Sequence, residues 1–188
     1  MSDTETLKSS LAELRRPFPS ASISFRPAVN KPSAKGFARV LSYIDSTDVR
    51  RRLNSVDPAW SFSIDSDAHW RGGIVEVRGT LTIFGQSRSD YGAAEVNKPR
   101  SFDGNPGEID FHAVKAASSD CFKRCANQFG VGDYLRDMGQ FFTDKLDIYN
   151  EYIQGINKDG VSELRAKYDR IVSHERFIAR YGEVSQWA

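Results

Sequence analysis

The chain has few of the residues that build metal centres, disulfides or membrane spans. It contains two cysteines and three histidines in 188 residues, and Cys121 and Cys125 stand four apart without histidines spaced as partners. We predict no metal site and interpret the cysteines as buried thiols in a reducing compartment. No apolar run approaches the roughly 20 residues of a membrane helix, and the polar, acidic start lacks a signal sequence. We therefore expect a cytoplasmic, nucleoid-associated protein.

Motifs for catalysis are also lacking. The sequence has no GxxxxGK[ST] phosphate loop, no HExxH and no GxSxG. We expect neither an enzyme nor a cofactor. A metal-dependent nuclease is the alternative, because scattered acids could converge in the fold. These acids are Asp65, Asp67, Glu76, Asp103, Glu108 and Asp110.

The charge is nearly balanced over the whole chain but not along it. The net charge is +1, and from Arg15 to Arg124 there are 17 Lys and Arg against 12 Asp and Glu. Acidic flanks surround this basic middle. Such a distribution favours an anionic partner, although a solvated surface without a partner could carry the same charges.

Apolar spacing predicts helices and a short strand in the first third of the chain. Leu7, Leu11 and Leu14 indicate a helix that PFP ends, and alternation around Ile23 and Phe25 indicates a strand. The remaining expectations here are a loop at Ala28–Gly36, a helix at Phe37–Ile44 and a helix that begins at Ser46-Thr47-Asp48 and ends before Pro58.

The central part of the sequence predicts an antiparallel β-meander of three strands. They are Trp60–Asp65, Gly73–Gly85 and a third strand from Gln86 to Gly92. We expect Asp67–Gly73 to be a turn and Ala93–Glu108 a long loop. The middle strand alternates between an apolar face (Val75, Val77, Leu81, Ile83) and a polar face (Glu76, Arg78, Thr80, Thr82). Period two with one polar face is typical of a sheet covered on one side. The expected class is α+β, a β-β-β-α core with helices on one face.

A helix beginning near Ile109 carries the stretch KAASSDCFKRCANQFGVGDYL, from Lys115 to Leu135. On a helical wheel it divides into two halves. The polar half holds Lys115, Ser119, Asp120, Lys123, Arg124 and Asn127, and the apolar half holds Val114, Ala117, Ser118, Cys121, Phe122, Cys125 and Phe129. Small residues let the helix sit close to the sheet, and the spaced bases suit a phosphodiester backbone. A solvated face with an Asp120–Arg124 pair fits the same spacing. Gly130 can end the helix with positive φ, and Gly132 lets the chain turn.

Two further amphipathic helices are predicted at Phe141–Ile156 and Val161–Tyr181. We therefore divide the chain into a core, residues 1–139, and a C-terminal helical extension, residues 140–188.

The run SSDCFKRCANQFGVGDYL resembles the signature helix of the Rad52 superfamily of single-strand annealing proteins, especially its DdrA-like (DNA damage response protein A) members. The similarity continues through PFP and SFRP, through SYIDSTDVRRRLNSV and WSFSI, and through VRGTLTIFG and YG. It extends in collinear order from Leu7 to Met138. The resemblance implies a β-β-β-α core whose protomers assemble into rings or helical arcs. Single-stranded DNA would follow a basic groove around the ring, without ATP.

The resemblance also implies the site. In the family the Lys-Arg pair of the signature helix contacts the DNA backbone, and here that pair is Lys123 and Arg124. Lys115 matches a base two turns earlier, and Asn127 stands where a third base is common. The sheet hairpin forms the opposite groove wall, for which Arg78 and Arg88 are the candidates. Arg51 represents the arginine run of the earlier helix.

The expected function is therefore ATP-independent binding and annealing of single-stranded DNA by a homo-oligomeric ring in DNA repair and recombination. One alternative is protection of 3′ single-stranded ends from nucleases without annealing. Another is a recombination scaffold whose C-terminal helices, Phe141 to Tyr181, recruit a repair protein.

Overall fold

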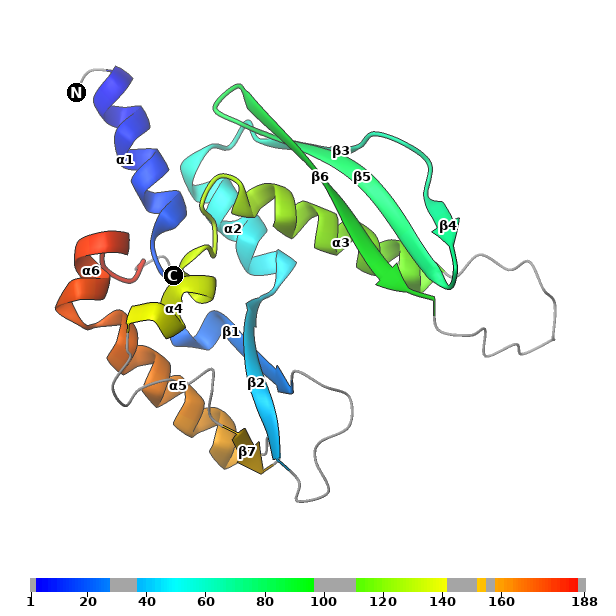
Figure 1. Ribbon diagram of the computed structural model, residues 1–188. Coiled ribbons are helices and arrows are strands. Elements are labelled where there is room, and N and C mark those ends of the chain that lie inside the picture. The colour runs from blue at the N-terminus through cyan, green and yellow to red at the C-terminus, as the bar shows by residue number, and fades with distance from the viewer. Residues whose placement is uncertain (1–2, 28–36, 97–110, 142–151, 155–157, 186–188) are drawn as a thin grey trace. The chain divides into compact units, whose positions relative to one another are not determined.

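The computed structural model describes residues 3–27, 37–96, 111–141, 152–154 and 158–185 (Figure 1). The chain divides into two compact units, one made of Met1–Asp48 with Gly130–Ala188 and the other of Val49–Phe129. Both combine helices with antiparallel sheets, which confirms the mixed α and β composition expected from the sequence. Within the described ranges, no helix has the length and apolar character needed to span a bilayer.

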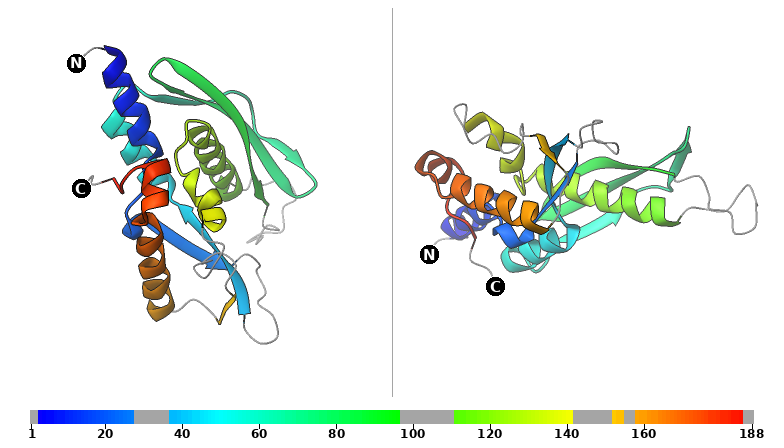
Figure 2. Two further views of the ribbon diagram at one scale, coloured as in Figure 1. Left: turned by 60° about the vertical axis from the view of Figure 1, so that its left-hand side comes forward. Right: turned by 90° about the horizontal axis from the view of Figure 1, so that it is seen from below.

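The first unit joins the two ends of the chain. Its sheet has the order β1-β2-β7, with β2 antiparallel to both neighbours. The elements are α1 (Asp3–Arg15), the 3-10 turn η1 (Ser20–Ser22), β1 (Ile23–Pro27), β2 (Phe37–Ile44), α4 (Tyr134–Phe141), β7 (Tyr152–Gln154), α5 (Lys158–Val172) and α6 (Glu175–Tyr181). Helix α5 lies beside η1 and β1 in the turned views (Figure 2).

A buried hydrogen-bond triad holds this unit together. The Tyr134 hydroxyl accepts from the Phe18 amide at 3.0 Å, and the Tyr168 hydroxyl donates to the Phe18 carbonyl at 2.5 Å. The two hydroxyls lie 3.0 Å apart, and all three residues are fully buried. The backbone amide and carbonyl of Phe18, in the segment after α1, are thus both hydrogen-bonded to tyrosines from α4 and α5. Helix α5 packs into the same core as the N-terminal segment, while the functional division at residue 139 stays a prediction.

Several predicted elements in this unit are wrong. Phe37–Ile44 is a strand and not a helix, because Val40–Ile44 pairs with Ile23–Pro27 and Phe37–Arg39 pairs with Tyr152–Gln154. Its aromatic and β-branched residues suit a strand, and the short apolar spacing fits both structures. Tyr152–Gln154 is a strand within the predicted helix Phe141–Ile156. The predicted helix Val161–Tyr181 is interrupted before α6, where His174 Nδ1 accepts from the Arg176 amide as an N-cap. The predicted loop at residues 28–36 lies outside the described residues.

The second unit is a sheet with a helix on one face (Figure 1). Strand β5 pairs along its whole length with β6 on one side, and on its other side with β3 and then β4. All pairs are antiparallel. The elements are most of α2 (Ser46–Val56), β3 (Ser61–Ile64), β4 (His69–Arg71), β5 (Ile74–Ile83), β6 (Gln86–Glu95) and α3 (Phe111–Asn127). Strand β4 replaces the predicted turn, and β6 extends into the predicted loop, of which residues 97–108 lie outside the described residues.

The packing of α3 on the sheet depends on a close backbone approach at Gly92. Val75, Val77, Leu81 and Ile83 are buried, as the alternation predicted, and α3 buries Ala117 and Cys121. A Cβ placed on Gly92 would lie 2.2 Å from both the Ala117 carbonyl oxygen and the Cys121 amide nitrogen. Only hydrogen fits there, so small residues on both elements set the height of the helix above the sheet. Beyond α3, Gly130 and Gly132 both have positive φ, 93° and 78°.

Gly92→Ala is expected to lower the free energy of unfolding by about 3 kcal/mol or more, because the methyl group must push α3 away from the sheet. Urea denaturation followed by circular dichroism would measure the change. Ala93→Ser, at the next and exposed position of β6, is the control and should leave stability nearly unchanged. Equal stability of Gly92→Ala and the wild type would contradict the close approach.

Tyr168→Phe is expected to lower the free energy of unfolding by about 1–3 kcal/mol, because the buried Phe18 carbonyl and the Tyr134 hydroxyl each lose a partner. The same denaturation experiment measures it. Tyr91→Phe removes a hydroxyl from a side chain that is 57% exposed and serves as the control. A loss no larger than that of the control would show that the triad contributes nothing.

Candidate nucleic-acid interface

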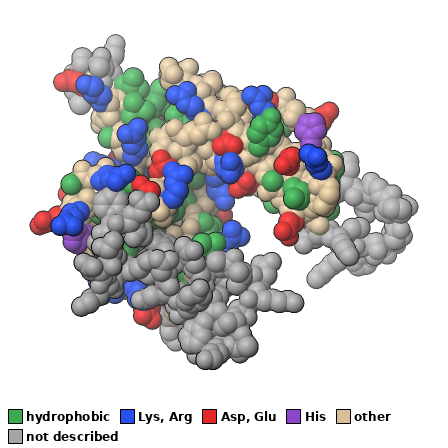
Figure 3. Space-filling view, in the orientation of Figure 1, with side chains coloured by type: hydrophobic (Ala, Val, Ile, Leu, Met, Phe, Trp, Pro, Cys, Tyr) green, Lys and Arg blue, Asp and Glu red, His purple; other side chains and the backbone are tan. Residues whose placement is uncertain are grey.

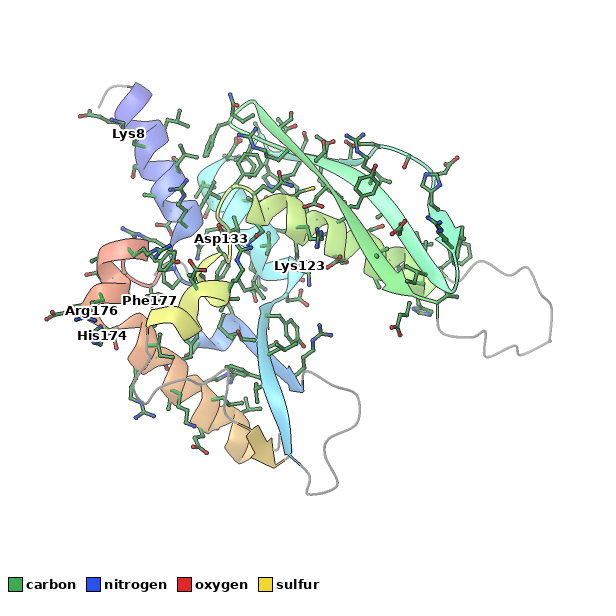
Figure 4. The ribbon with its side chains drawn as sticks, in the orientation of Figure 1. Lys8, Lys123, Asp133, His174, Arg176 and Phe177 are labelled. Carbon is green, nitrogen blue, oxygen red and sulfur yellow. The ribbon has the colours of Figure 1, made fainter. Side chains whose placement is uncertain are left out.

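A stripe of polar side chains runs along α3 on the side away from the sheet. Lys115, Ser119 and Lys123 follow one another at intervals of four residues, which places the two lysines about 12 Å apart along the axis. Lys115 is exposed and Lys123 is half-buried. Figure 4 labels Lys123 on α3. Among the described residues neither lysine has an ion pair or hydrogen bond.

Arg124 points to a different side, over the edge of β6. Its Nε and Nη2 both lie 3.2 Å from Asp90 Oδ1, and its side chain is 54% exposed. One turn later, Gln128 Nε2 donates to Asp90 Oδ2 at 3.1 Å and to the Ser89 carbonyl at 3.0 Å. The helix thus holds the β6 carboxylate with two neighbouring side chains.

The Asp90 carboxylate stays ionised in this setting. Its partial burial alone would raise its pKa. Hydrogen bonds from the Tyr91 amide, Gln128 and Arg124, together with the Arg124 charge, outweigh burial and hold the pKa below the ordinary value of 3.8. Arg124 therefore faces a full negative charge at neutral pH.

Asp120 is not the partner of Arg124 in the structure, although the helical spacing allowed that pair. Its Oδ2 accepts from the Ala93 amide of β6 at 3.3 Å. Asp120 and Arg124 each contact the strand below α3, because both lie on the side of the helix that overhangs β6. The edge of the sheet, which the helical wheel did not include, decides both partners.

The two hairpin arginines lie on opposite faces of the sheet. Arg88 is paired with Leu81, which faces α3, and its guanidinium stands 5.5 Å from the centre of the Phe129 ring. Arg78 is on the open face, where its Nη1 lies 3.9 Å from Asp65 Oδ2. The structure therefore brings Arg88, but not Arg78, to the side of the sheet that carries α3. Contact of either residue with DNA stays a prediction.

The arginine run of α2 has three different environments. Arg51 is exposed, Arg50 places its guanidinium 4.8 Å from the centre of the Phe122 ring, and Arg52 is fully buried. Arg50 and Arg51 are thus both exposed, and Arg52 is the buried member of the run. Asn127, the last residue of α3, is half-buried.

The cysteines are buried, as expected, and contact the sheet. Cys121 Sγ donates to the Asp90 carbonyl and Cys125 Sγ to the Gly79 carbonyl. Burial, followed by the neighbouring Cys125, raises the pKa of Cys121 to about 12, which is unsuitable for a nucleophile. No group of three or more potential metal ligands occurs within the described residues. Asp103, Glu108 and Asp110, named as candidates from the sequence, lie outside them.

The sequence did not point to Asp90 or Gln128 as residues of this site. Gln128 stands four residues after Arg124, so helical periodicity could have placed it on the same side. No local pattern connects Asp90 to either residue, because the contact depends on the packing of β6 against α3.

Comparison with known protein families gives a match to the Rad52/22 family double-strand break repair protein over residues 6–152. The chain belongs to this family. The match includes α3 and all of the sheet beneath it, and it ends before α5.

Two curated relatives, both from the genus Deinococcus, carry the name single-stranded DNA-binding protein DdrA. The protein of Deinococcus deserti is 38% identical over 126 residues, which are 66% of this chain and 55% of the relative. The protein of Deinococcus radiodurans is 36% identical over 134 residues, 70% of this chain and 56% of the relative. The chain thus spans little more than half the length of these relatives. No solved structure matches it significantly.

Asp90→Asn is expected to reduce the loss of stability in acid. Since the folded pKa of Asp90 lies below its unfolded value, its stabilising contribution is present above about pH 3.8 and is lost as the pH falls through the folded pKa. Urea unfolding between pH 7 and pH 2.5 would show a smaller decline in the variant than in the wild type. Glu76→Gln, on the opposite face, is the control, and identical declines for Asp90→Asn and the wild type would contradict the prediction.

Proposed function

We propose that this member of the Rad52/22 family binds single-stranded DNA along α3 and anneals complementary strands without ATP in DNA repair. The observation that carries the proposal is the stripe of Lys115, Ser119 and Lys123 on α3, with Arg124 next to it, in a chain whose relatives are named single-stranded DNA-binding proteins. Lys115, Lys123 and Arg124 contact backbone phosphates. Asn127, Arg51, Arg78 and Arg88 are further candidates for contacts along the strand.

The spacing of the stripe supports contact with a backbone rather than with bases. Lysines on one helix face present point charges at regular intervals, and phosphate contacts of this kind bind without sequence preference. The Ser119 hydroxyl lies between Lys115 and Lys123 and supplies a hydrogen-bond donor. A strand held by its phosphates leaves the base edges accessible to a second strand.

Each protomer supplies only a few such contacts, so the proposal includes a homo-oligomeric ring. A strand that crosses many protomers binds by the sum of weak contacts, with an effective concentration set by the fixed spacing of the subunits. The ring explains how a chain of net charge +1 can hold a polyanion. Base pairing supplies the free energy of annealing, so nucleotide hydrolysis has no role.

Replacement of Lys123 and Arg124 together by alanine is expected to weaken binding of single-stranded DNA about tenfold or more and to abolish annealing. The slope of log K against log salt should fall by up to about 1.4, because two phosphate contacts are lost. Fluorescence anisotropy of a labelled oligonucleotide measures binding, and two labelled complementary oligonucleotides without ATP measure annealing.

The matched control is Arg165→Ala/Arg170→Ala, which removes the same charge from exposed positions of α5, outside the residues that match the family. It should bind and anneal like the wild type. Tight binding without annealing by the wild type would favour end protection, which a 3′-exonuclease challenge then tests. Cleavage of DNA upon addition of Mg²⁺ would instead support the nuclease alternative. Absence of binding would contradict the proposal.

A further inference from the structure

The carboxylate of Asp90 is fully engaged by groups around the end of α3. Oδ1 accepts from Arg124 Nε and Nη2 and from the Tyr91 amide at 2.7 Å, and Oδ2 accepts from Gln128. The side chain is 23% exposed. Asp90 thus has a fixed position beside one of the two bases proposed to hold DNA.

Lys123 and Arg124 differ in whether an acidic side chain lies beside them. Lys123 has no acidic partner among the described residues, whereas Arg124 has Asp90. A guanidinium carries five N–H donors, and those that Arg124 does not direct at Asp90 are left on a side chain that is 54% exposed. A phosphate can approach these remaining donors, but it competes with Asp90 for Nε and Nη2. The phosphate then lies close to the Asp90 carboxylate, and the repulsion between the two anions weakens the contact.

We propose that Asp90 limits the affinity for single-stranded DNA by competing with phosphate for Arg124. This inference rests on the proposed function of α3. Annealing requires that a bound strand leave the protein as duplex, so a groove that bound too tightly would keep the strand from its complement. On the face drawn in Figure 3, Lys and Arg side chains (blue) are intermixed with Asp and Glu side chains (red).

Asp90→Asn tests the proposal because asparagine keeps the shape and one acceptor oxygen but removes the charge. We expect single-stranded DNA to bind about three- to tenfold more tightly, as expected for removal of one nearby like charge. The salt dependence should become steeper, by up to about 0.7 in the slope for each phosphate that Arg124 newly engages. Annealing at saturating protein should become slower, since the strand is released less readily.

Two comparisons isolate the role of Arg124. Asp120→Asn makes the same change of charge on the same side of α3, at a residue that bonds to the Ala93 amide and not to Arg124. It should leave affinity and salt slope near the wild-type values. In the background of Arg124→Ala, the Asp90→Asn change should no longer increase affinity, because the carboxylate has no guanidinium to compete for.

The outcomes separate this inference from the proposed function. If the wild type does not bind single-stranded DNA, the proposed function fails. If the wild type binds and Asp90→Asn matches Asp120→Asn in affinity and slope, the function stands and the role of Asp90 is overturned. Weaker binding by Asp90→Asn that is still folded at the assay temperature, as judged by its circular dichroism spectrum, would also overturn it, since Asp90 would then only position Arg124.

Discussion

The close contact between the backbones of α3 and β6 at Gly92 determines the geometry on which the candidate site depends. At this point the Ala117 carbonyl and the Cys121 amide come so near the strand that no side chain fits between them. The height and direction of the helix are therefore fixed within narrow limits. One turn later, this places Arg124 and Gln128 directly over Asp90. A larger residue at the contact would separate the base from the carboxylate.

The same contact divides the polar side of α3 into two surfaces. Lys115 and Lys123 face away from the sheet, where the described part of the chain offers no acidic partner. Arg124 overhangs β6 and has its charge partly offset. Under the proposed function, Lys115 and Lys123 would attract the strand, and Asp90 of β6 would limit its contact with Arg124.

Much of the fold could be predicted from the sequence where a local pattern had one interpretation. The alternation of β5 identified both its faces, and the small residues of α3 predicted its close packing. The predicted helix at Phe37–Ile44 is wrong because its apolar spacing fits both a helix and a strand, and only the pairing with β1 and β7 decides between them. The sequence predicts a turn in place of strand β4, because three residues beside a glycine pair resemble a turn and form a strand only by pairing with β5.

The candidate site also combines features that local sequence predicts with features that depend on tertiary contacts. Sequence alone determined that Lys115, Lys123 and Arg124 lie on one helix and which residues of that helix face the sheet, because helical periodicity is a local property of the chain. Only the tertiary structure decided that Arg124 pairs with Asp90 and not with Asp120, and that Arg78 and Arg88 lie on opposite faces. These relations join residues more than ten positions apart or depend on strand register. A one-residue change of register would reverse the faces without altering any local pattern.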